Sequence, residues 1–237
     1  MNISTFLTLI SLATMALTSC GDSDKPKSSV TEDSGKSAAP ARAEAEQPQV
    51  MLSSTTIGKQ TWTNRNFNGT TYRNGDPIPE CKTAEDWQRH HMQGIGCWCW
   101  YDNNPEMNEY YGKIYNFFAM VDARGIAPKG WHVPTKYEWE EMYMTLGGIY
   151  DSQPKLKSPN GWFRDTNGTD ESGFFGTAGG YRMDDGQFTE LTRFGMWWSA
   201  VDEEGQTWIQ NLSYNDGDPS RRYGTRGGGF SLRFVKD

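Results

Sequence analysis

The stretch Pro134–Gly148, PTKYEWEEMYMTLGG, contains the clearest local signal in the chain. Thr135 and Glu138 have the spacing of a capping box, in which each side chain satisfies a backbone N–H group at the start of a helix. The apolar side chains that follow share one helical face: Trp139, Met142, Tyr143 and Leu146. Because two glycines then stop the pattern, the sequence predicts a helix over residues 136–146 that buries an aromatic face.

Upstream of this helix, the pattern predicts one early strand and two further helices. Residues 57–68 alternate weakly and lead to an Asn-Gly turn, which is typical of a strand. Residues 83–92 begin with a threonine cap and acids in the first turn, as helices do. Residues 113–123 place apolar side chains at helical spacing before a glycine.

Downstream of the helix, short apolar runs alternate with glycine, asparagine and aspartate. This pattern is typical of short strands joined by irregular turns. The whole chain therefore predicts an α+β domain in which helices come first and short, irregular antiparallel strands with long loops follow. If Trp197 and Trp198 lie on one strand, their side chains point to opposite faces.

The N-terminal residues differ from the rest of the chain. Residues 1–19 carry no charged side chain, and the apolar stretch Phe6–Leu17 has the length of a signal-peptide core. The run Leu17-Thr18-Ser19-Cys20 resembles the bacterial lipobox, which implies that Cys20 is acylated and becomes the mature N-terminus. We therefore expect residues 1–19 to be a signal peptide and the protein to be lipid-anchored in the bacterial cell envelope, at the outer membrane or cell surface. An ordinary secretory signal with an incidental cysteine is the alternative.

Residues 21–50 contain no aromatic side chain and are rich in proline, serine, alanine and glutamate. Such a segment cannot bury enough apolar surface to offset its conformational entropy. We expect Cys20 and this segment, residues 20–50, to form a disordered tether. Residues 51–237 then form a single folded domain.

Charge and aromatic content limit the function classes. The chain has 30 acidic and 23 basic residues, a net charge of −7, which argues against a nucleic-acid partner or a basic membrane-binding face. Aromatic side chains make up 14% of the residues, so the folded part has an aromatic-rich core. No apolar run reaches the roughly 18–20 residues of a membrane helix.

Three cysteines follow the tether: Cys81, Cys97 and Cys99. A disulfide from Cys81 to Cys97 or Cys99 would close a loop of about 16–18 residues and stabilise the fold by roughly 3 kcal/mol. The alternative is a soft metal site that includes His90 and His91. Because a C-x-C motif beside a histidine pair lacks the spacing of structural zinc sites, we expect no metal there.

An ordered series of motifs extends from Trp98 to Asp237. In chain order the motifs are YDN 101–103, YGKIYN 111–116, APKGWHVP 127–134, LGG 146–148, KLKS 155–158, ESGF 171–174, GGYR 179–182, WWS 197–199 and SLR 231–233. In identity and order they resemble the Fibrobacter succinogenes major paralogous domain.

A more distant likeness concerns the segment Pro134–Glu140 and the late Arg226-Gly227-Gly228. They resemble the formylglycine-generating-enzyme-like group, which implies a C-type-lectin-like α+β core. That enzyme oxidises a cysteine by means of a cysteine pair in its C-terminal half, where copper binds. This chain has no cysteine after Cys99, so the resemblance does not carry the oxidase activity with it.

The remaining polar groups predict no catalytic site. Acidic pairs stand in glycine-rich turns, where aspartate is common for backbone reasons. We expect no cofactor, with Ca²⁺ at Asp216-Gly217-Asp218 as the open alternative. His132 is expected to be a hydrogen-bonded structural residue.

We predict that the glycine-rich C-terminal half forms a binding surface. The polar groups that suit a glycan or peptide groove are Arg182, Arg193, Asn211, Asn215, Arg221 and Arg222. The expected ligand contacts are Arg182, Trp197, Trp198 and Arg222, because an exposed ring offers stacking area and a guanidinium group fixes orientation. The expected function is a surface-tethered lipoprotein with a non-catalytic module that binds a glycan or protein ligand. The alternative is a degenerate enzyme of the formylglycine-generating-enzyme-like superfamily.

Overall fold

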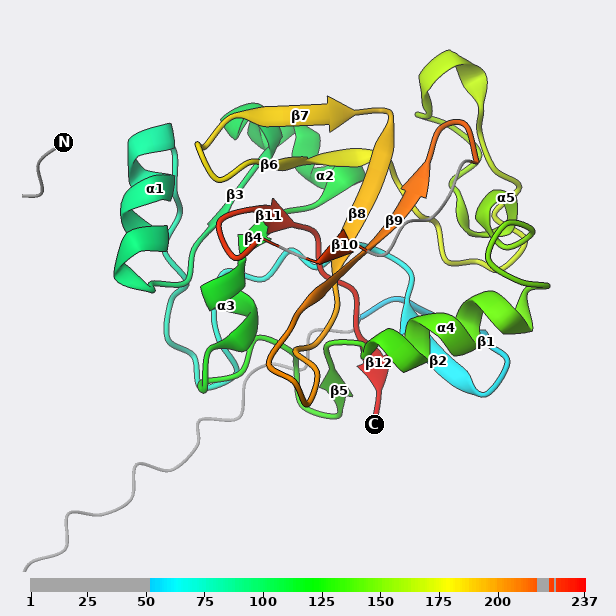
Figure 1. Ribbon diagram of the computed structural model, residues 1–237, viewed down its shortest axis with the longest axis horizontal. Helices are drawn as coiled ribbons and strands as arrows, with labels where there is room; N and C mark the ends of the chain where they lie inside the picture. Colours follow the sequence, from blue (N-terminus) through cyan, green and yellow to red (C-terminus); the bar gives the residue numbers. More distant parts are fainter. Residues whose placement is uncertain (1–51, 217–221, 224) are drawn as a thin grey trace, which may run out of the picture. The chain divides into compact units, whose positions relative to one another are not determined.

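The computed structural model describes residues 52–216, 222–223 and 225–237 (Figure 1). The predictions about residues 1–50, namely the signal peptide, the acylated Cys20 and the tether, lie outside the described residues. Within the described ranges, no helix is long and apolar enough to cross a membrane.

The described strands form two sheets. The four-stranded antiparallel sheet has the order β1 (Ser54–Ile57), β2 (Gln60–Thr63), β12 (Val235–Lys236) and β5 (Trp131–His132). The eight-stranded sheet has the order β10 (Arg222–Tyr223), β9 (Trp208–Ser213), β8 (Phe194–Trp198), β6 (Gly179–Arg182), β11 (Gly229–Phe230), β4 (Ile114–Asn116) and β3 (Trp98–Cys99), with β7 (Phe188–Leu191) paired to β6. The pairing of β6 with β8 is parallel.

Two helices have ten residues each, and both begin as the sequence predicts. In α1 (Ala84–Gln93), the side chain of Thr83 accepts a hydrogen bond from the Asp86 backbone N–H. In α4 (Lys136–Thr145), both hydrogen bonds of the capping box between Thr135 and Glu138 are present. The shorter helices are α2 (Asn108–Tyr111), α3 (Phe117–Val121), α5 (Gln153–Leu156), η1 (Tyr101–Asn103), η2 (Pro105–Met107) and η3 (Phe163–Asp165).

The prediction of one helix over residues 113–123 is wrong in its first half. Residues 114–116 form β4, which pairs with β3 and β11, and only residues 117–121 are helical. Asn116 marks the change, since its side chain accepts a hydrogen bond from the Ala119 backbone N–H and so caps α3. Helical spacing of apolar side chains did not reveal the strand, because all three residues of β4 are buried.

The α+β class is confirmed, but the predicted order of helices before strands is wrong. β1 and β2 precede α1 in the chain. Their hairpin is part of the sheet that contains β12, where Val235 pairs with Trp62. The last strand of the domain thus joins the sheet that the first two strands form. No local sequence pattern reveals this pairing.

The core consists of aromatic clusters that lie on opposite faces of β8. Trp197 packs with Trp139 of α4, whose ring centroid is 6.1 Å away. Trp198 packs on the other face against Phe230, at 4.7 Å. The prediction that these two tryptophans face opposite sides is confirmed. Figure 1 shows α4 beside the β1–β2 hairpin, and the contact of Trp139 with Trp62 of β2, 4.7 Å between ring centroids, joins the two.

Candidate functional site

Three of the four predicted ligand contacts are buried. Arg182 and Trp197 are each 1% exposed and Trp198 is 0% exposed. The exposed ring that the prediction assumed is not found, because Trp197 and Trp198 pack into core clusters on opposite faces of β8. The side chain of the fourth, Arg222, lies outside the described residues.

Arg182 links two backbone segments by hydrogen bonds. Its Nε donates to the carbonyl oxygen of Gly186 and its Nη1 to that of Cys81, both at 2.9 Å. The guanidinium carbon also lies over the rings of Trp87, at 4.8 Å, and Phe188, at 4.6 Å. The planar guanidinium group, which the sequence analysis assigned to a ligand, is therefore occupied by contacts inside the protein.

Trp197 belongs to a second buried network, centred on Asn66. Asn66 Oδ1 accepts hydrogen bonds from Trp197 Nε1, at 2.8 Å, and from Arg233 Nε, at 2.6 Å. The other N–H groups of Arg233 donate to three backbone carbonyls: those of Thr63, Phe174 and Phe175. Burial lowers the pKa of Arg233 to about 9. The WWS and SLR motifs therefore each contribute one side chain, Trp197 and Arg233, to this network.

Lys113, from the YGKIYN motif, is also held inside the protein. It is buried, and its Nζ lies 3.8 Å from the centroid of the Trp100 ring and 4.6 Å from that of Trp98. Nζ donates to the carbonyl oxygen of Asn68 at 2.7 Å. Because burial disfavours the charged form, the pKa of Lys113 falls to about 8.

The three cysteines of the domain are free and buried. The predicted disulfide from Cys81 to Cys97 or Cys99 is absent from the structure. A hydrogen bond with Cys81 and burial raise the pKa of Cys97, and burial raises that of Cys99 to about 12. Among the described residues, no group of three or more histidine, cysteine, aspartate or glutamate side chains could hold a metal ion.

The predicted Ca²⁺ turn is described only at Asp216. Its carboxylate accepts a hydrogen bond from Lys157 Nζ at 2.9 Å. Gly217 and Asp218 lie outside the described residues.

His132 is hydrogen-bonded on both ring nitrogens, which confirms that prediction. Nε2 lies 2.7 Å from Glu138 Oε1 and Nδ1 lies 2.8 Å from Asp237 Oδ1. The other oxygen of Glu138 accepts the Thr135 backbone N–H of the capping box. Burial lowers the pKa of His132, but the hydrogen bonds to the two carboxylates raise it more, and the net direction is upward.

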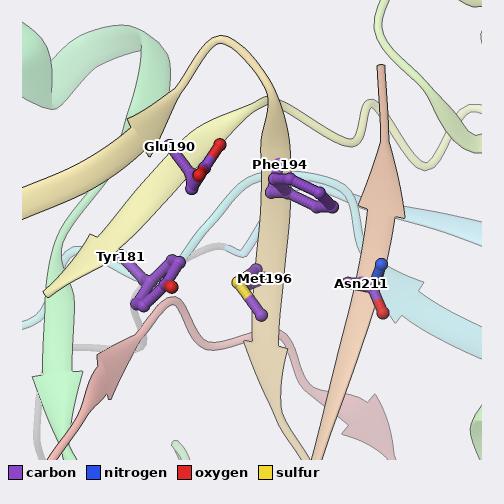
Figure 2. Close-up of a pocket in the computed structure, with 5 residues that line it drawn as sticks. All are labelled: Tyr181, Glu190, Phe194, Met196 and Asn211. Carbon is purple, nitrogen blue, oxygen red and sulfur yellow. The ribbon is translucent and has the colours of Figure 1, made fainter. Parts of the chain in front are cut away.

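A pocket of about 210 Å³ opens on the eight-stranded sheet. Five residues from four strands line it: Tyr181 of β6, Glu190 of β7, Phe194 and Met196 of β8, and Asn211 of β9. We call this cavity the sheet pocket. Figure 2 shows Tyr181 and Glu190 on one side of β8 and Asn211 on the other, with Phe194 and Met196 between them.

Strand register brings these side chains together. Phe194 and Met196 are two positions apart on β8, so they share a face. Asn211 is the direct antiparallel partner of Met196. On the other side, Gly180 pairs with Gly195, which places Tyr181 beside β8. Tyr181 stacks on Phe230 of the core, with 5.4 Å between ring centroids.

Asn211 has an unusual environment for a buried amide. It is 4% exposed, and its Oδ1 has no hydrogen-bond partner among the described residues. Asn116, which is 2% exposed, accepts two backbone N–H groups through Oδ1 and donates through Nδ2 to the Ile95 carbonyl. Buried polar atoms are nearly always paired, so an unpaired one that lines a cavity requires an explanation.

The turn between β7 and β8 forms the rim of the sheet pocket at Glu190. Glu190 and Thr192 have φ of +62° and +64°. This region is costly for residues other than glycine, above all for a β-branched threonine. The turn is closed by a hydrogen bond from the Arg193 N–H to the Glu190 carbonyl, 3.1 Å. Strained backbone thus coincides with the rim of the cavity.

Glu190 also lines a second, more open pocket of about 360 Å³. The other residues of this second pocket are Tyr101, Thr189, Leu191 and Arg193. Arg193 lies over the ring of Phe163, with 4.5 Å from the guanidinium carbon to the ring centroid. The Glu190 side chain therefore stands between two adjoining hollows.

Of the polar groups that the sequence suggested for a groove, Asn211 lines the sheet pocket and Arg193 lines the second pocket. Tyr181 lies within the GGYR motif, but the sequence analysis assigned the binding role to its neighbour Arg182. Glu190, Phe194 and Met196 were missed. The two-residue spacing of Phe194 and Met196, which puts both side chains on one face of a strand, was the available signal.

A family model described as the Fibrobacter succinogenes major domain matches residues 55–236. Since the match covers well over half of the chain, the protein belongs to this family, and the resemblance noted in the sequence is confirmed. No curated protein and no solved structure matches the chain. The likeness to formylglycine-generating-enzyme-like proteins stays a prediction.

Proposed function

We propose that this member of the Fibrobacter succinogenes major domain family is a non-catalytic binding module whose sheet pocket takes one small group of a larger ligand. The observation that carries the proposal is Asn211, a buried amide among the residues that line the pocket, whose Oδ1 has no hydrogen-bond partner among the described residues. A ligand donor at that oxygen would satisfy a buried acceptor that otherwise costs stability.

The size and lining of the sheet pocket support binding of part of a molecule. Its volume of about 210 Å³ lies below the roughly 300–1,000 Å³ of sites that enclose a drug-sized ligand. One peptide side chain or one sugar ring is a suitable occupant. The lining contributes one carboxylate, Glu190, whereas acid–base glycoside hydrolysis uses a pair.

We further propose that the domain is displayed in the bacterial cell envelope on a lipid anchor at Cys20, with residues 20–50 as the tether. The lipobox-like run before Cys20 and the low aromatic content of the tether support this arrangement. We also propose a C-type-lectin-like variant of the α+β fold, which the short strands and long connections support. Recognition by such a fold occurs through loops on a packed scaffold.

The binding role is tested with a panel of glycans and peptides and the full chain purified in detergent, with affinity measured by calorimetry. Phe194→Ala removes the ring at the centre of the sheet pocket, and we expect about tenfold weaker binding. Tyr150→Ala removes an exposed tyrosine elsewhere and serves as the control, with unchanged affinity expected. Equal affinities for the two variants, or no binding across the panel, would overturn the proposal.

The lipid anchor needs a separate test. Cys20→Ser should move the protein from the membrane fraction to the soluble fraction, and mass spectrometry of the unaltered protein should find an acylated Cys20 at its N-terminus. A Cys20→Ser variant that stays membrane-bound would contradict the anchor and leave the pocket proposal intact.

A further inference from the structure

We infer that the group taken by the sheet pocket is the ammonium end of a lysine side chain on a basic partner protein. The inference rests on the proposed function of the pocket and names the chemistry of its ligand. It follows from the acceptors, the apolar floor and the charges that surround the cavity.

The sheet pocket presents acceptors and aromatic rings but no cation. Glu190 contributes a carboxylate, and Asn211 contributes an amide whose Oδ1 is unpaired among the described residues. Tyr181 contributes a phenol, Phe194 a ring and Met196 a thioether. An ammonium group has three donors and no acceptor, so it fits acceptors of this kind. A cation within about 6 Å of an aromatic ring gains further attraction, and the pocket offers the rings of Tyr181 and Phe194.

Glu190 is available for such a cation. No ion pair involves Glu190 within the described parts of the chain. The nearest basic residue in its turn, Arg193, has its guanidinium over the ring of Phe163. The carboxylate at the rim can therefore pair with a charge that arrives from outside.

The floor of the sheet pocket favours a lysine over other amines or sugars. Between the acceptors lie the ring of Phe194 and the thioether of Met196 (Figure 2). The four methylene groups of lysine can lie along such a floor while the charged end stays with its partners. A phosphate or carboxylate would be repelled by Glu190, and a neutral sugar would leave the carboxylate without a counter-charge.

The charge of the whole chain points to a basic partner. The net charge of −7 attracts a lysine-rich protein over distances comparable to the Debye length and repels an acidic one. Complementary charge of this kind raises association rates and favours the right partner.

The test uses the full chain and the tripeptide Ac-Gly-Lys-Gly-NH₂, with the Nε-acetyl-lysine, arginine and norleucine versions as competitors in the same titration. We expect acetylation of the lysine to weaken binding at least tenfold, and the arginine peptide to bind several-fold more weakly than the lysine peptide. Glu190→Gln should weaken the lysine peptide about tenfold. Glu203→Gln removes an equal charge from an exposed loop position and should leave the affinity within twofold.

The outcomes separate this inference from the proposed function. If the acetyl-lysine or norleucine peptide binds as tightly as the lysine peptide, and Phe194→Ala weakens it, the lysine assignment is overturned while the binding pocket stands. If neither Phe194→Ala nor Glu190→Gln changes any affinity, both are overturned. Equal effects of Glu190→Gln and Glu203→Gln would reduce the interaction to long-range charge and overturn the assignment of lysine to the pocket.

Discussion

Replacing Asn211 by leucine should make the protein more stable. The two side chains have similar size, and Asn211 is 4% exposed with an Oδ1 that has no partner. An unsatisfied buried polar atom costs about 1–3 kcal/mol, and leucine removes that cost while adding apolar contact beside Met196. We expect the free energy of unfolding to rise by about 1–2 kcal/mol. For a domain of this size, that corresponds to an increase in Tm of roughly 2–8 °C.

Urea denaturation followed by tryptophan fluorescence measures this change. The matched control is Asn116→Leu, which removes an equally buried amide that has all its partners. The free energy of unfolding of this control should fall by about 3 kcal/mol or more, because two N–H groups and one carbonyl are left unpaired. A loss of more than about 1 kcal/mol in Asn211→Leu would refute the view that this amide is held for a ligand and not for the fold.

Three further predictions concern the core, the His132 cluster and the thiols. Trp139→Ala should lower the free energy of unfolding by roughly 3–5 kcal/mol in the same assay, since Trp139 is buried against Trp62, Phe174 and Trp197; a near-neutral result would contradict the helix face. Because the pKa of His132 is raised on folding, its stabilisation is fully present below about pH 6.5 and is lost as the pH rises through the folded pKa. His132→Gln should remove that part of the pH profile, and an unchanged profile would show that the ion pairs contribute nothing to stability. In the native protein, iodoacetamide at pH 8 should label Cys81, Cys97 and Cys99 far more slowly than in urea, as measured by mass spectrometry; rapid native labelling would contradict their burial.

The parts of the fold that the sequence predicted are those with local causes. A capping box and one apolar face determine α4, and these signals lie within about a dozen residues of one another. β4 was missed because its pairing partners, β3 and β11, lie outside its own stretch of sequence, and β11 is more than a hundred residues away. Strand pairing of this kind depends on tertiary contacts that propensity does not contain.

The sequence did not predict the candidate site for a related reason. The motifs contain side chains that look suited to recognition, such as Arg182 and Trp197. Such side chains are equally suited to donate to acceptors inside the protein, here the Gly186 carbonyl and the Asn66 side-chain oxygen. The sheet pocket is instead assembled from five positions on four strands, two of them on β8. Only the register of β8 with β6 and β9 places Tyr181, Met196 and Asn211 on one surface.

The pairing of β2 with β12 has a consequence for biosynthesis. The Phe234 N–H donates to Thr63 Oγ1, 171 positions earlier in the chain. At about 5–20 residues per second, a ribosome needs roughly 10–30 s to produce the residues between them. During that interval the edge of β2 lacks its partner, and an unpaired edge invites association with other chains. The edge of β2 in a nascent chain is therefore open to association until Phe234 and Val235 have emerged, and a chaperone that protects the first hairpin would act in that interval.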